Sequence, residues 1–197
     1  MGLAIFCLLV PLLFASLTRA QPSVEVPVFD IPTTDSTINF YVKASVAIEG
    51  SFDRWNANLR FASRDARTGV LNIRVQADSV DTGSNIKNST LEGKDFFDVR
   101  RNPFITFTST KIVQTGPDTF DVDGDFAIRG VSKGERLTLT VFGAGTGSGE
   151  IKGTMAFDRK DYGMNSSIPF IRIANRVEVR VNLKVKRVSG PPLVFKR

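Results

Sequence analysis

Apolar and polar residues alternate along much of this chain with a period of two, which is typical of β-strands with one buried face. The longest run extends from Ile38 to Ile48, where six apolar residues alternate with intervening residues that are mostly polar. The pattern predicts eight strands, over residues 37–48, 59–61, 71–78, 105–107, 120–128, 137–141, 151–157 and 176–186.

Short turn sequences separate these segments, and they favour an antiparallel sheet because parallel strands need long crossovers. The first and last strands are both long, and each would leave an exposed, aggregation-prone sheet edge unless the two pair with each other. We therefore predict an all-β, eight-stranded antiparallel barrel of the up-and-down type. The predicted turns are Glu49-Gly50, Arg67-Thr68-Gly69, Thr115-Gly116-Pro117-Asp118 and Gly130 to Gly134.

Two segments interrupt the strand pattern, and both are long enough to fold over the mouth of a barrel. The segment from Ser84 to Arg101 is expected to form a short helical flap that ends at Asn102-Pro103. Residues 161–173 are expected to form a long irregular connection. The residues that favour the helix are the candidate N-caps Asn88, Ser89 and Thr90 and the apolar Leu91, Phe96 and Phe97.

The first twenty residues have the pattern of a secretory signal peptide. An apolar run from Leu3 to Leu17 is interrupted by Pro11 and is shorter than the roughly 20 residues of a spanning helix. We expect cleavage after Ala20 and a periplasmic or secreted protein, with a retained anchor as the alternative. The expected organisation is a signal peptide over 1–20, an extended lead-in over 21–35, a barrel domain over 36–188 and a tail over 189–197.

The charge and the residue composition of the chain limit the functions that it can have. The formal net charge is +6, or +5 after loss of Arg19, and the basic residues are scattered. We therefore predict no nucleic-acid partner. A weak contact with an anionic membrane surface is compatible with the net positive charge. The chain has no histidine, and its one cysteine, Cys7, lies in the signal segment. Without the commonest general base and thiol nucleophile, we predict no enzyme, no catalytic residue and no metal site.

Four phrases in fixed order carry a family resemblance: Asp78-Ser-Val-Asp-Thr-Gly83, Lys94-Asp-Phe-Phe-Asp-Val99, Pro103-Phe-Ile-Thr-Phe-Thr-Ser-Thr110 and Gly130-Val-Ser-Lys133. In order, spacing and wording the chain resembles the YceI-like, polyisoprenoid-binding family from about Thr37 to about Val188. A further phrase, Asp161-Tyr-Gly-Met164, also matches. The resemblance implies a small exported protein whose lipocalin-like barrel encloses a long isoprenoid or similar lipid tail.

Under this resemblance, inward-facing apolar residues line the lipid tail. Small inward residues, Gly124, Gly153 and Ala77, would leave room for it. The pattern alone equally allows a barrel filled by its own side chains, because periodicity identifies the buried face and not a cavity. The predicted tail-lining residues are Phe40, Val42, Phe61, Ile73, Val75, Phe107, Phe126, Met155, Phe157 and Met164.

The head group of the ligand would lie at the barrel mouth. Where family members often carry Arg-Asp-x-His-Leu, this chain has Lys87-Asn-Ser-Thr-Leu91, so the family's head-group preference does not transfer. We expect no covalent cofactor, and a bound isoprenoid lipid such as a quinone or prenyl phosphate. The predicted mouth residues are Lys87, Asn88, Ser89, Phe96, Phe97 and Asp161.

Two other functions remain open at this point. The protein could be a structural or interaction protein of the envelope, with a side-chain-filled barrel and a Pro-rich tail, Ser189 to Arg197, that engages a partner. It could also be an enzyme that acts on a bound lipid through a carboxylate or a lysine. The sequence leaves the oligomeric state open, a dimer included.

Overall fold

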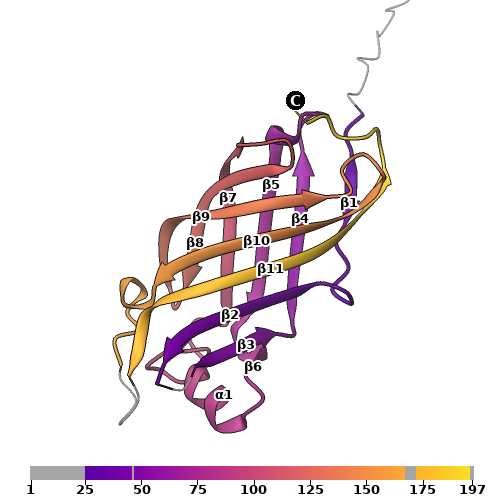
Figure 1. Ribbon diagram of the computed structural model, residues 1–197. Coiled ribbons are helices and arrows are strands. Elements are labelled where there is room, and N and C mark those ends of the chain that lie inside the picture. Colours follow the sequence, from indigo (N-terminus) through magenta and orange to yellow (C-terminus); the bar gives the residue numbers. More distant parts are fainter. Residues whose placement is uncertain (1–24, 46, 167–171, 196–197) are drawn as a thin grey trace, which may run out of the picture.

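The computed structural model describes residues 25–45, 47–166 and 172–195, so the predicted signal peptide lies outside the described residues. Within them, eleven strands form one antiparallel sheet that curls round an apolar interior (Figure 1). The strands are β1 Val28–Asp30, β2 Thr37–Ala44, β3 Ile48–Phe52, β4 Trp55–Phe61, β5 Gly69–Gln76, β6 Val80–Asp81, β7 Phe104–Gln114, β8 Thr119–Ile128, β9 Val131–Phe142, β10 Ser148–Asp158 and β11 Ile173–Ser189.

The strand order shows how the sheet closes. It runs β4-β5-β7-β8-β9-β10-β11-β2-β3-β6, and only Asp53 and Arg54 separate β3 near one end from β4 at the other. The predicted pairing of the first and last long strands is confirmed, since β2 pairs with β11. β1 also pairs with β11, and its Phe29 ring meets Phe61 of β4 edge to face at 5.7 Å. The barrel fold is therefore confirmed.

The predicted number of eight strands is too low. The strands missed are β1, β3 and β6, which have three, five and two residues, too few to show a clear alternation. β1 lies in the segment for which we expected only an extended lead-in. The predicted strand from 37 to 48 is in fact two strands, because β2 ends at Ala44 and Ile48 belongs to β3, opposite Val42.

Two predicted turns need correction. Glu49-Gly50 lies inside β3, and its glycine is explained by close packing, because a Cβ on Gly50 would lie 2.6 Å from the Phe40 ring. Between β8 and β9 only Arg129 and Gly130 form the turn, with φ of 54° and 75°, and Val131 to Gly134 already belong to β9. The predicted turn at 115–118 is confirmed between β7 and β8.

The helical part of the flap is shorter than expected. Helix α1 spans Asn85–Glu92, with Ser84 as its N-cap instead of Asn88, Ser89 or Thr90. The chain then continues in tight turns, where the amide of Phe97 donates to the carbonyl of Leu91 at 2.9 Å. No helix among the described residues is long and apolar enough to cross a membrane.

Three short 3-10 helices connect strands. They are η1 Ala66–Thr68, η2 Ala77–Ser79 and η3 Arg159–Tyr162. η2 braces the β3–β4 junction, because the carbonyl of Ser79 accepts from the amide of Asp53 at 3.1 Å and its hydroxyl accepts from the amide of Arg54 at 3.1 Å. The junction that closes the barrel is therefore held by hydrogen bonds from outside the two strands it joins.

Candidate functional site

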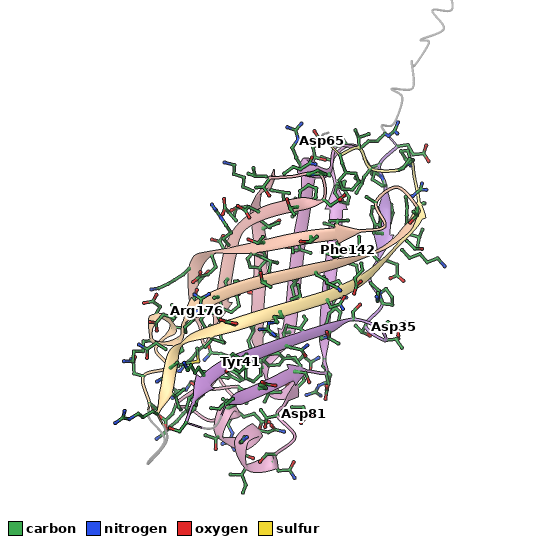
Figure 2. All side chains as sticks on the ribbon, in the orientation of Figure 1. Asp35, Tyr41, Asp65, Asp81, Phe142 and Arg176 are labelled. Atoms are coloured by element: carbon green, nitrogen blue, oxygen red, sulfur yellow. The ribbon has the colours of Figure 1, made fainter. Side chains whose placement is uncertain are left out.

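Two apolar cavities lie inside the barrel, each of about 100 Å³. Cavity 1 lies toward the end that carries α1, near Asp81 in Figure 2, and Leu91, Phe96 and Phe97 of the flap form part of its wall. Cavity 2 lies toward the opposite end, near Asp65, where Ala66 and Phe195 line it. Both cavities are lined mainly by the inward-facing side chains of the strands.

The structure places nine of the ten predicted tail-lining residues on cavity 1. Eight of them occupy inward positions on strands, as the period of two requires, and Met164 follows η3. The exception is Phe61, which lines cavity 2. The nine are Phe40, Val42, Ile73, Val75, Phe107, Phe126, Met155, Phe157 and Met164.

The small residues do not leave the room that we expected. A Cβ on Gly124 would lie 2.6 Å from the Phe107 ring. A Cβ on Gly153 would lie 2.6 Å from Val181 Cγ2 and 2.7 Å from Leu139 Cδ2. Neighbouring side chains therefore fill the space above both glycines, and the free volume lies elsewhere.

An aromatic cluster supports one side of cavity 1. The Phe126 and Phe157 rings are 4.9 Å apart, and both meet the ring of Tyr162 edge to face, at 5.4 and 5.2 Å. The hydroxyl of Tyr162 donates to Glu135 Oε1 at 2.8 Å. Burial and the Glu135 carboxylate raise the pKa of Tyr162 well above its usual range, so this hydroxyl stays protonated and holds η3 against β9.

Arg159 is a candidate site residue that the sequence reasoning missed. Its side chain borders cavity 1 and the residue is 6% exposed. Its guanidinium donates to the carbonyls of Ala174 at 3.2 Å, of Ser166 at 3.0 Å and of Met164. Among the described residues no carboxylate pairs with it, so it is a buried cation that is held by neutral carbonyls.

A signal for Arg159 was present in the sequence. Met155 and Phe157 are inward positions of β10, and the same period of two reaches Arg159 directly after the strand. A basic residue that continues an apolar face is unusual, because a charged group is rarely buried without a partner. The predicted strand over residues 151–157 ends one inward position before Arg159.

The predicted mouth residues separate into two groups. Phe96 and Phe97 are buried and line cavity 1, and the centroids of the Phe97 and Phe52 rings lie 6.0 Å apart. The remaining four do not border the cavity. Lys87 and Ser89 are exposed on α1, Asn88 Oδ1 accepts from the amide of Thr82 at 2.9 Å, and Asp161 pairs with Lys133 at 3.3 Å. Their role at a head group stays a prediction.

The flap is held by a few contacts of α1, such as Leu91 at cavity 1, and by the turns that follow the helix. α1 has no buried residue, and Ile86 on it is 82% exposed. The guanidinium of Arg129 reaches the turn after α1, where it donates to the carbonyl of Lys94 at 2.9 Å. Within the described residues no group of His, Cys, Asp and Glu could hold a metal ion.

Known proteins share both sequence and fold with this chain. A model of the YceI-like domain matches residues 29–185. A UPF0312 protein of Pseudomonas syringae pv. tomato is 28% identical over 127 residues, which cover 62% of this chain and 66%, just under two thirds, of that relative. A UPF0312 protein of Vibrio parahaemolyticus is 26% identical over 161 residues, 80% of this chain and 85% of the relative.

Two solved structures with this fold show the likeness. BcnA of Burkholderia cenocepacia has a TM-score of 0.71 at 24% identity, over 79% of this chain and 99% of BcnA. A polyisoprenoid binding domain from Saccharophagus degradans, implicated in plant cell wall breakdown, has a TM-score of 0.65 at 16% identity, over 82% of this chain and 99% of the domain. The match of the family model over residues 29–185 shows that the chain belongs to the YceI-like domain family.

Proposed function

We propose that this protein binds a long-chain apolar lipid, of the isoprenoid class, with the tail of the lipid in cavity 1. The observation that carries the proposal is a wall of hydrocarbon and thioether side chains, apart from Thr106, with the buried cation Arg159 at its edge. The polyisoprenoid binding domain that shares the fold supports the choice of ligand class. Each buried methylene group would contribute about 0.8 kcal/mol to binding.

The volume of cavity 1 means that binding requires movement of its walls. A cavity of about 150 Å³ accepts one benzene ring, so about 100 Å³ holds roughly one isoprene unit. Met155 and Met164 can change rotamer at low cost because their side chains are unbranched. The flap can shift where Phe96 and Phe97 move out of the wall, because α1 itself has no buried residue that would hold it. A longer tail would enter by displacing these parts.

The head group would remain at the mouth, next to the flap and to Arg159. A guanidinium is a strong donor to a phosphate or quinone oxygen, and its charge would favour an electron-rich head group. We further propose that the protein acts outside the cytoplasm, after removal of residues 1–20. Amino-terminal sequencing of the protein from a native host would test that step.

Extraction with organic solvent and mass spectrometry of the purified native protein tests the main proposal. A prenyl lipid recovered in a fixed ratio to the protein is the expected result. A Val75→Phe variant, which fills cavity 1, should bind added quinone about tenfold more weakly, since it displaces about two methylene groups. The matched control is Val70→Phe on the same strand, where the side chain is 44% exposed.

The second candidate is a structural protein with a packed interior, and the small volume of cavity 1 favours it. In that case the extracted protein would contain no lipid. Added quinone or prenyl phosphate would then bind to neither the wild type nor the Val70→Phe control. These two results together would contradict the proposal of lipid binding.

A further inference from the structure

A belt of three buried side chains separates the two cavities. Leu71 of β5, Val122 of β8 and Leu183 of β11 are 2%, 0% and 0% exposed. They come from three different points around the wall (Figure 1). None of them lines cavity 1 or cavity 2.

The position of the belt follows from the strands that carry it. On β11, Val181 lines cavity 1 and Val185 lines cavity 2, and Leu183 is the inward residue between them. On β8, Phe126 and Phe120 line cavities 1 and 2 on either side of Val122. On β5, Ile73 lines cavity 1 on one side of Leu71, and Ala66 of η1, which precedes β5, lines cavity 2 on the other side.

Other side chains fill the gaps between the three belt residues. Gly153 and Gly124 face inward at this level, but Val181, Leu139 and Phe107 occupy the space above them. The wall is braced here, since the buried hydroxyl of Ser109 accepts from the amide of Leu71 at 2.8 Å.

At the mouth the flap also buries Phe96 and Phe97, but these lie on turns outside the sheet, whereas each belt residue lies on a strand that is paired on both sides. A tail that enlarges cavity 1 would therefore displace the flap more readily than the belt.

We propose that the belt of Leu71, Val122 and Leu183 sets the longest lipid tail that the barrel accepts, and that the tail ends there without entering cavity 2. The inference rests on the proposed function of cavity 1. It makes these three side chains specificity-determining residues, although they lie far from any head group. Cavity 2 then remains a separate space that the C-terminal segment covers through Phe195.

Binding of a graded series of prenyl alcohols, from geraniol to solanesol, tests the belt. Native mass spectrometry of the delipidated full-length mature protein would give the dissociation constant for each alcohol. For the wild type, affinity should rise with length up to a limit and then stop rising. In Leu71→Ala and Leu183→Ala, alcohols longer than the limit should bind about tenfold more tightly, because further carbons would enter the barrel.

The matched control is Leu193→Ala, which removes the same atoms from the part of the wall of cavity 2 that the C-terminal segment forms. It should leave the limit unchanged. Milder variants, Leu71→Val and Leu183→Val, replace either belt variant that does not melt cooperatively. The proposal for the belt is wrong if the length limit moves equally in the control variant, or if the wild type shows no limit up to solanesol. Either result leaves the proposal of lipid binding intact. A wild type that binds no alcohol of any length overturns both proposals.

Discussion

At the scale of single residues, Tyr162 shows how one hydroxyl couples the wall of cavity 1 to pH. Its pKa is raised by burial and by Glu135, so the folded state favours the neutral phenol. The resulting stabilisation is complete below the ordinary tyrosine pKa of about 10 and is lost as the pH rises above that value. The wild type should therefore lose thermal stability as the pH rises from about 10 towards the raised pKa of Tyr162.

Tyr162→Phe tests this interpretation. At pH 7 the variant loses the hydrogen bond to Glu135, which costs about 1 kcal/mol, or about 2–4 °C in melting temperature. Its melting temperature should then fall less than that of the wild type when the pH is raised. Tyr41→Phe, on the outside of β2, is the control, because the chain has only two tyrosines. Equal alkaline losses in wild type and Tyr162→Phe would contradict the role of this hydroxyl.

At the scale of secondary structure elements, a glycine inside a strand can mark a place where side chains of neighbouring strands lie over its Cα. Gly153→Ala places a methyl group 2.6 Å from Val181 and 2.7 Å from Leu139. We expect a loss of about 1–3 kcal/mol in the free energy of unfolding, measured by urea denaturation. Gly134→Ala in β9 is the matched control, since no atom lies within 4 Å of its added methyl group. A loss in the control as large as in Gly153→Ala would point to backbone entropy or strand propensity instead.

The long strands were predictable because alternation over seven or more residues determines which face is buried. The same pattern placed eight predicted residues on cavity 1, but it gave no depth along the barrel, and Phe61 therefore lies at the other end. The short strands β3 and β6 gave too little pattern. The flap was harder, because α1 has no buried stripe that would indicate which of Lys87, Asn88 and Ser89 faces the mouth.

At the scale of the whole molecule, the two ends of the barrel are closed by different means. The flap covers the end at cavity 1, and the C-terminal segment covers the end at cavity 2. That segment is tied to the β4–β5 connection, where the amide of Val194 donates to the carbonyl of Arg64 at 2.7 Å and the amide of Ala66 donates to Val194 at 3.2 Å. Phe195 then packs edge to face on Phe120 at 5.9 Å.

Removal of residues 190–197 should open cavity 2 and expose Phe120. We expect a loss of about 1–3 kcal/mol, because a partly buried phenylalanine and two backbone hydrogen bonds are removed, and the melting temperature measures it. Deletion of only the last two residues keeps Phe195 and serves as the control. If the belt ends the tail, the truncated protein melts earlier yet keeps the same limit in the series of prenyl alcohols. A limit that moves to longer alcohols would instead mean that the tail runs through the whole barrel and that Phe195 is its stop.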